Sequence, residues 1–445
     1  MVRVSLLLVV LLPGIALAQA TLNFEQSGKQ NQAAAPASSA QRGPAPQTPT
    51  GRLVTLEDAV RLALQNSPTL KAARTQIDQN KAQEITANLR PNPTLSGDSQ
   101  FVPIFHPSLL GQDLEQFDIG IGYLFERGRK RQNRLQAARD ATAVTESQVA
   151  DTERTLTFNV AQAFINALLA NSTLEFAQQD LKSFQQTVDI SEQRYKAGDI
   201  SEGDYLKIKL QLLQFETDVS SARVARVQAL ASLRQLIGYA ALPADFDVAG
   251  DLSYEPLHGN LSDLQAAALR ERPDLKAAQL GVQAAQSQIS LAKANGKQDV
   301  NFTLNYTHLS GTDANSSASF FLGVPLPIFD RNQGEIARTR FALSQAELTE
   351  KANEDAVMTD VQNAFESVRT NGEVVQLYTS GYLKEAQDSR DISEYAYKGG
   401  AATLLDFLDA ERSYRSTQLA YRDALAAYMT SMEQLRQAVG TRTLP

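Results

Sequence analysis

Cysteine and tryptophan are both absent from this chain of 445 residues. Without cysteine the chain can form no disulfide and no thiolate metal site, and it offers no cysteine for a lipid anchor behind a signal peptide. With only four methionines and three histidines, a relay of soft ligands for metal ions is not expected either. A chain of this length without disulfide bonds must be held together by the packing of its own side chains or by assembly with other chains.

The sequence also lacks any arrangement typical of a catalytic or cofactor site. His106, His258 and His308 are scattered, and they form neither an HExxH motif nor the spacing of a catalytic triad. Nothing resembles a nucleotide-binding loop, and the formal charge of −8 disfavours nucleic acid as a partner. We therefore expect no enzyme activity, no cofactor and no bound metal.

Long apolar runs are missing outside the N-terminal segment. Residues 1–20 combine Arg3, the apolar run VSLLLVVLLPGIAL and a small-residue cleavage site, which predicts a secretory signal peptide cut after Ala18 or Ala20. Residues 21–50 are rich in Ala, Gln, Pro and Ser and predict a disordered leader. No later stretch approaches the roughly 20 apolar residues of a membrane-spanning helix.

What the sequence does contain is a duplication. LEDAVRLALQNSPTLKAA at 56–73 matches LSDLQAAALRERPDLKAA at 261–278, and RYKAGDISEGDYL at 194–206 matches AYKGGAATLLDFL at 396–408. The two halves also close alike, with LRQLIG and LRQAVG, and a nearly constant offset is the signature of an internal repeat. We infer repeat 1 at 51–238, a linker of the equatorial region at 239–260, repeat 2 at 261–440 and a tail at 441–445.

Both repeats predict the same succession of elements. A short helix that ends at a proline is followed by a second helix, two strands, a very long helix, a glycine turn and a last helix. The expected helices are 55–65, 69–90, 131–197 and 202–237 in repeat 1, and 261–270, 274–295, 332–398 and 403–439 in repeat 2. Each long helix would measure about 100 Å.

Apolar residues recur at helical spacing along both long helices, which predicts coiled-coil packing of helix on helix. The two stripes are Leu156, Val160, Ala163, Phe164, Ala167 and Leu168 in repeat 1, and Val357, Val361, Ala364, Phe365, Val368 and Val375 in repeat 2.

Four segments alternate apolar and polar residues, as strands with two different faces do. Repeat 1 contributes 94–105 and 115–126, and repeat 2 contributes 299–309 and 317–329. Each is close to the roughly 9–11 residues that a tilted strand needs to cross a bilayer. Four strands cannot close a barrel in lipid, but four from each of three chains can. The alternative is a small soluble sheet that caps a helical bundle.

The duplicated helix–strand–strand–helix order, RPNPTL at 90–95, PLPIFDRNQGEIA at 325–337 and the run YKGG…LLDFLDAERSYRSTQLAY together resemble the TolC family of outer-membrane efflux channels. The resemblance extends from Leu53 to Gly440. Its FDRNQG segment is most similar to the CzcC and CusC branch, which serves heavy-metal resistance pumps. Many relatives carry a lipidated cysteine at the mature N-terminus, and this chain departs from them in that respect.

The resemblance implies a mainly α fold with a small membrane β-barrel. The implied assembly is a homotrimer whose twelve-stranded barrel in the outer membrane is continued by a twelve-helix periplasmic tunnel of about 100 Å. The implied partners are a periplasmic adaptor protein, an inner-membrane pump of RND type and outer-membrane lipid.

The implied function is a passive conduit of a tripartite efflux system, with heavy-metal cations as the cargo that the branch suggests. Multidrug efflux and type I protein secretion are alternatives for such a conduit. A soluble periplasmic coiled-coil protein, structural or adaptor-like, is the alternative from a different class.

The ends of the long helices hold the candidate functional residues. Gly198 and Gly400 follow the long helices, where glycine permits the left-handed geometry that ends a helix. Asp204, Asp406 and Asp409 lie near the starts of the last helices, where acids interact favourably with the helix dipole.

The resemblance gives these residues a second role. Asp406 and Asp409 would face the lumen at the periplasmic constriction, and Tyr397 would bond to Asp204 when the tunnel is closed. The family often adds an arginine contact two residues after the turn glycine, but that position is Ala402 here.

The segment RGRKRQNR at 127–134 is a local exception to the acidic composition. It is either a solvated turn that enters a helix or an anchor beside anionic lipid headgroups.

Overall fold

A computed structural model describes residues 52–100, 115–310 and 315–444 of the chain. The expected signal peptide and leader, His106, and the second part of the expected strand 94–105 lie outside these ranges.

The helices follow the same order in both repeats. Repeat 1 contains α1 (Leu56–Asn66), α2 (Pro68–Ala87), α3 (Lys130–Ala197) and α4 (Glu202–Ile237); repeat 2 contains α5 (Leu261–Glu271), α6 (Pro273–Asn295), α7 (Gln333–Leu377), α8 (Leu383–Lys398) and α9 (Leu404–Val439). The two prolines at these helix boundaries, Pro68 and Pro273, do more than end α1 and α5. Each is the first residue of the next helix, where its missing N–H would have had no partner in any case.

The expected continuous helix 332–398 is wrong at one point. A π-helical turn at Tyr378–Tyr382 separates α7 from α8, and Gly381 within it has a φ of 157° and a ψ of −30°. Such a backbone angle interrupts the regular hydrogen-bonding ladder, and glycine tolerates it. The corresponding helix of repeat 1, α3, is unbroken over 68 residues. The predicted apolar stripe ends at Val375, before the break, and therefore gave no sign of it.

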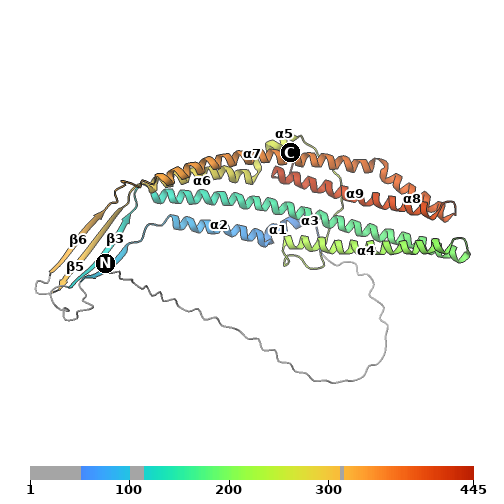
Figure 1. Cartoon of the computed structure of the whole chain (residues 1–445), viewed down its shortest axis with the longest axis horizontal. Coiled ribbons are helices and arrows are strands. Elements are labelled where there is room, and N and C mark those ends of the chain that lie inside the picture. Colours follow the sequence, from blue (N-terminus) through green and yellow to red (C-terminus); the bar gives the residue numbers. More distant parts are fainter. Residues whose placement is uncertain (1–51, 101–114, 311–314, 445) are drawn as a thin grey trace, which may run out of the picture. The chain divides into compact units, whose positions relative to one another are not determined.

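The long helices pack side by side, as Figure 1 shows, with α3 in contact with α2, α4, α6 and α9. On the other side, α7 packs on α5, α6 and α9, and α8 packs on α9. The two apolar stripes predicted from the sequence form the contacts: Leu156, Val160, Phe164, Ala167 and Leu168 are buried in one core, and Val357, Val361, Ala364, Val368 and Val375 in another. Ala163 and Phe365 pack partly buried against these cores.

The strands form one antiparallel sheet in the order β2-β3-β5-β6. They are β2 (Thr94–Gln100), β3 (Glu115–Phe125), β5 (Val300–Ser310) and β6 (Asn315–Gly323). The expected strand 317–329 is wrong at its C-terminal end, because β6 stops at Gly323. Pro325 and Pro327 follow, and proline has no N–H to donate to a sheet.

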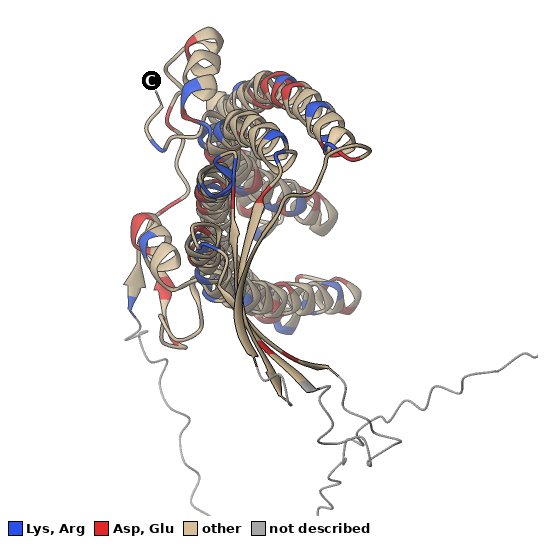
Figure 2. Ribbon diagram, turned by 90° about the vertical axis from the view of Figure 1, so that its left-hand side faces the viewer, with Lys and Arg blue, Asp and Glu red and all other residues tan. Residues whose placement is uncertain are grey.

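The register gives the sheet two different faces. Ile121 lies opposite Leu95 on one side and Leu304 on the other, and Leu304 lies opposite Phe320, so these four apolar residues share a face. The adjacent row lies on the other face and consists of Ser96, Gly120, Asn305 and Ser319. Figure 2 shows that the strands carry few charged residues, whereas both signs are spread over the helices.

A second, minimal sheet connects the segment that links the repeats to the start of repeat 1. β4 (Asp247–Val248) pairs in parallel with β1 (Leu53–Val54). Asp247 also accepts hydrogen bonds from Asn171 and Arg226, which lower the pKa of its carboxyl against the opposing effect of burial. The linker 239–260 is thereby attached to α3 and α4.

Candidate functional site at the helical tips

Two similar turns close the ends of the helical hairpins, and we call them the tips. Gly198 ends α3 with a φ of 83°, and Gly400 has a φ of 77° after α8, so both adopt the left-handed conformation predicted for them. In each turn the amide after the glycine donates to a carbonyl five residues earlier, from Asp199 to Arg194 and from Ala401 to Ala396. The duplication therefore extends to the detailed geometry of the tips.

Asp204 and Asp406 lie in the first turns of the helices that leave the tips, and both bond to the residue that caps their helix. Ser201 accepts from the amide of Asp204 at 3.1 Å, and its hydroxyl donates to the Asp204 carboxylate at 2.9 Å. Thr403 and Asp406 form a full capping box, because the Thr403 amide also donates to the Asp406 carboxylate. These hydrogen bonds from Thr403 lower the pKa of Asp406, so its carboxylate stays charged into the acid range.

Asp409 lies one turn further along α9 and is exposed. Arg412 is its only ion-pair partner among the described residues, at 3.1 Å. A pair this exposed contributes little to stability, so the Asp409 carboxylate is available to solutes at the tip.

Tyr397 does not bond to Asp204 within the chain. Its side chain is buried, and its hydroxyl lies 3.5 Å from the hydroxyl of Ser191 on α3. Asp204 instead has Ser201 and Lys207 as its partners in the described part of the chain. The expected Tyr397–Asp204 lock is therefore not a contact between the two hairpins of one chain.

The two tips are joined by an arginine that the sequence reasoning missed. Arg194 of α3 donates to the backbone carbonyl of Tyr397 at 2.7 Å, and its guanidinium lies 5.5 Å from the centre of the Tyr397 ring. An arginine in the last turn of a helix usually hydrogen-bonds to carbonyls of its own helix. The position of Arg194 in the sequence therefore did not indicate a contact with the other hairpin. Arg194 supplies an arginine contact at the tip although Ala402 cannot.

Behind the tips, aromatic rings stack across the two hairpins. Tyr397 stacks on Phe407, Phe407 is parallel to Phe184, and Phe184 stacks on Phe215 with ring centres 4.2 Å apart. The rings come from α8, α9, α3 and α4 in turn, and Arg415 covers the far side of Phe215. Stacked rings in a buried cluster give the four helices a fixed relative position.

A pair of buried carboxyl groups lies beside this stack. Asp180 of α3 and Glu411 of α9 are each 5% exposed and hydrogen-bond to each other. Burial and the Asp180 charge raise the pKa of Glu411 to about 8, and burial also raises the pKa of Asp180. At neutral pH the pair therefore holds a proton.

Nearby arginines partly compensate the negative charge of this carboxyl pair. The Nε of Arg415 lies 2.7 Å from Asp180 in an ion pair that lacks hydrogen-bond alignment, and Arg415 also contacts Asp218 of α4. Arg390 of α8 adds its positive charge. Groups from all four tip helices thus meet at this pair.

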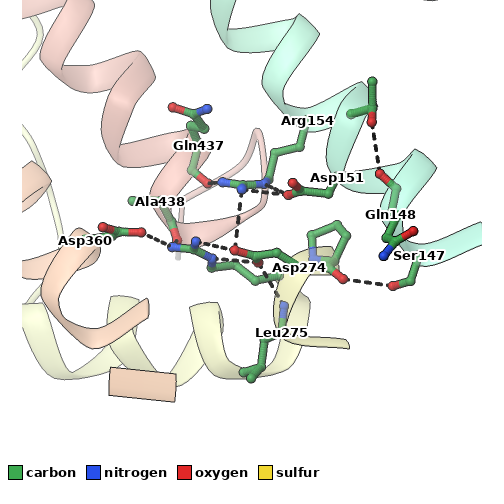
Figure 3. A network of polar contacts seen from close by, with 12 residues as sticks. Ser147, Gln148, Asp151, Arg154, Asp274, Leu275, Asp360, Gln437 and Ala438 are labelled. Carbon is green, nitrogen blue, oxygen red and sulfur yellow. Dashed lines mark hydrogen bonds and ion pairs between the residues drawn. The ribbon is translucent and has the colours of Figure 1, made fainter. Parts of the chain in front are cut away.

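Further from the tips, a polar network joins the two repeats (Figure 3). Arg272 is 5% exposed and binds Asp274 on α6, Asp360 on α7 and the carbonyl of Ala438 on α9. Arg154 of α3 donates to the carbonyl of Gln437 at 2.6 Å and pairs with Asp151 and, at 3.7 Å, with Asp274. The network fixes α3, α6, α7 and α9 to one another at the start of α6.

In residues 52–100, 115–310 and 315–444, no group of three or more acidic or histidine side chains is placed to hold a metal ion. His258 and His308 lie far apart in the fold, on the linker and on β5. Within the same ranges, none of the helices combines the length and apolarity needed to cross a membrane.

Hairpins of very long helices attached to a two-faced sheet are the architecture of an outer-membrane channel subunit. The solved open-state structure of the MtrE outer membrane channel of Neisseria gonorrhoeae superposes with a TM-score of 0.71 at 20% identity, over 87% of this chain and 89% of that one.

The chain belongs to the outer membrane efflux protein family, whose model matches residues 59–239 and 264–441. It is 23% identical to the cobalt-zinc-cadmium resistance protein CzcC of Cupriavidus metallidurans over 84% of this chain and 86% of that protein. It is 26% identical to the cation efflux system protein CusC of Escherichia coli K12 over 85% of this chain and 84% of that protein. The resemblance to the TolC family, the outer-membrane location and the role as an efflux channel are confirmed.

Proposed function

We propose that the chain is the outer-membrane conduit of a tripartite exporter of heavy-metal cations and that it works as a homotrimer. The observation that carries the proposal is the two-faced sheet with two open edges. Among the described strands, β2 and β6 each have only one neighbour. An unpaired strand edge is not tolerated in lipid, so a sheet in the membrane needs further copies to close it.

The apolar face of the sheet supports the same conclusion. Ile119, Ile121, Leu304 and Phe320 are each more than half exposed in the single chain. An exposed apolar surface of this kind suits contact with acyl chains. The polar face, with Asn305 and Thr303, would line the lumen of a twelve-stranded barrel.

The outer helices of the single chain also present apolar residues that lack a partner. Exposed apolar residues on α4 recur at intervals of three, four or eleven, as on the face of a helix that packs against another helix. They are Leu206, Leu210, Leu213, Val224 and Val227. Ile392 and Tyr395 are similarly exposed on α8. We infer that neighbouring copies cover these edges and complete a helical tunnel below the barrel.

The metal cargo rests on the relatives, because CzcC and CusC are named for cation resistance and efflux. The chain would pass such ions without binding them tightly, and an inner-membrane pump of RND type with a periplasmic adaptor would supply energy and selection. Asp406 and Asp409, three copies of each, would form acidic rings at the periplasmic opening.

The proposal is tested by deleting the gene and measuring growth and cell-associated metal with added cobalt, zinc, cadmium, copper or silver. We expect sensitivity and metal accumulation, both restored by the intact gene. Sensitivity to organic antibiotics or solvents alone would instead indicate a multidrug conduit. Crosslinking in purified outer membranes should trap three chains, and a stable membrane-inserted monomer would exclude the shared barrel.

A further inference from the structure

A groove of about 210 Å³ lies where the sheet joins the helices. It is formed by the segment after α2 and by the turn from β3 into α3. Three of its lining residues are cations, Arg90, Lys130 and Arg131, and two are aromatic, Tyr123 and Phe125. The groove belongs neither to the tips nor to the polar network between the repeats.

Two of the cations have no acid to neutralise them. Lys130 pairs with Asp299 at 2.7 Å, and the groove's one acid, Glu126, is bound by Arg134 at 2.7 Å. Arg90 and Arg131 have no carboxylate partner among the described residues. The positive charge of the groove is therefore available for an anion.

The backbone around the groove is fixed, so these cations are held in place. Gly128 and Arg129 are both left-handed, with φ values of 74° and 58°. A Cβ at Gly128 would lie 2.5 Å from the side chain of Lys297, which packs on the turn. Asp299 accepts from the amide of Arg127 as well as from Lys130, and it thereby attaches the turn to the start of β5.

The groove opens toward the apolar face of the sheet. Tyr123 lies opposite Phe302 and shares the face of Ile121 and Leu304, because the residues of a strand alternate between faces. Phe125, which is 54% exposed, lies on the same face at the end of β3. A ligand with a negative head and an apolar tail could place its head between the arginines and its tail on the sheet.

We propose that this groove binds the phosphate of an anionic phospholipid from the periplasmic leaflet of the outer membrane, with Arg90 and Arg131 as its ligands and the apolar face of the sheet beneath its acyl chains. The inference rests on the membrane placement of the sheet in the proposed function, but not on the cargo. A protein partner is less suited, because the unpaired cations adjoin a surface that lipid itself would cover.

The test uses the full chain, purified as the assembled oligomer in an uncharged detergent. Binding of a fluorescent phosphatidylglycerol is followed by anisotropy, with a phosphatidylcholine that carries the same fluorophore as the zwitterionic comparison. The variant is Arg90→Gln with Arg131→Gln. The control is Lys182→Gln with Lys384→Gln, which removes two exposed, unpaired cations from α3 and α8 instead.

Each arginine beside an anionic headgroup contributes about fivefold in affinity, so the double variant should bind phosphatidylglycerol about 25-fold more weakly. Wild type and control should bind it equally and should prefer it to phosphatidylcholine. Equal binding by the variant, or an equal loss in the control, would overturn the proposal. Displacement of the lipid by inorganic phosphate at similar concentration would also overturn it, in favour of a site for a free anion.

Conductance in planar bilayers separates this inference from the proposed function. A variant that conducts like wild type but loses the lipid preference supports the groove. A wild-type protein that neither inserts nor conducts refutes the membrane placement on which both rest.

Discussion

Arg194 of α3 donates a hydrogen bond of 2.7 Å to the backbone carbonyl of Tyr397 on α8. The contact crosses from the hairpin of repeat 1 to the hairpin of repeat 2, within one turn of both tip glycines. Since the acceptor is a backbone atom, no substitution of Tyr397 removes it. The donor side chain, in contrast, can be removed.

Replacing Arg194 with Ala should loosen the tip. A hydrogen bond from a charged donor contributes about 1.5–3 kcal/mol, and the assembly would contain three copies. We expect higher single-channel conductance and greater entry of large antibiotics, with the oligomer intact. Lys196→Ala is the matched control, since in the part of the chain that the structure describes Lys196 pairs only with the exposed Glu192 on its own helix. Equal conductance in wild type and Arg194→Ala would show that the tip is held elsewhere.

The change of Tyr397 to Phe separates the hydroxyl from the ring. Among the described residues this hydroxyl has only Ser191 as a partner, at 3.5 Å, while the ring stacks on Phe407 and is kept in the variant. We expect conductance close to wild type. A large increase, matched by Asp204→Ala, would reveal a Tyr397–Asp204 bond between neighbouring copies.

Replacing Asp406 and Asp409 with Asn should shift ion selectivity away from cations and weaken block by multivalent cations. Acidic rings attract cations into a narrow opening, and Asn keeps the size of the side chain while removing its charge. Because Thr403 lowers the pKa of Asp406, wild-type selectivity should persist into moderately acidic solution. Reversal potentials in bilayers under a salt gradient measure this, and unchanged potentials would place both residues outside the opening.

Glu411 should make stability depend on pH. Its pKa rises from 4.5 to about 8 on folding, so between these values the folded state holds a proton that the unfolded state has released. The free energy of unfolding should therefore fall as pH rises from about 4.5 to about 8, by on the order of a few kcal/mol, and level off above that.

Glu411→Gln should remove that decline, measured as the melting temperature across this pH range. Glu335→Gln is the control. Arg338 lowers the pKa of the exposed Glu335, so any dependence of stability on the titration of Glu335 is confined to pH values below 4.5. A decline that persists unchanged in Glu411→Gln would assign it to another group.

Arg272→Ala should destabilise the fold strongly. It would leave Asp274 and Asp360 without their shared partner, and each hydrogen bond to a charged group contributes about 1.5–3 kcal/mol. Arg270→Ala removes an exposed arginine of α5 that has no ion-pair partner among the described residues, and it should change stability by less than about 0.5 kcal/mol. Chemical denaturation of both variants measures the difference, and similar values would contradict the structural role of the network.

The sequence could predict the elements that depend on local patterns. Pro68 and Pro273 marked helix boundaries, Gly198 and Gly400 marked helix ends, and alternation marked the strands. These signals act within a few residues of chain, where sterics and hydrogen bonding decide the outcome. Pro325 lay inside an expected strand and should have shortened it by the same reasoning.

The contacts between distant segments could not be predicted in this way. Arg194 binds across two hairpins, and the Asp180–Glu411 pair joins residues of different repeats that are unrelated by the duplication. Both depend on how the helices pack, which the periodic pattern does not specify. The break at Gly381 was equally hidden, because the apolar stripe of α7 gives no sign of it.

The packing of α3 against both α6 and α9 has a consequence for how the chain reaches its native state. The bond from Arg154 to the carbonyl of Gln437 spans 283 positions of sequence. A growing chain presents its first half long before α9 exists, so the side of α3 that packs on α6 and α9 stays uncovered until synthesis is nearly complete. Each half contributes most of its own apolar core, but the core of repeat 2 includes Leu425, Leu435 and Val439 of α9. Truncation before α9 should therefore leave both that core and the adjoining side of α3 uncovered, and yield an aggregation-prone product that depends on periplasmic chaperones.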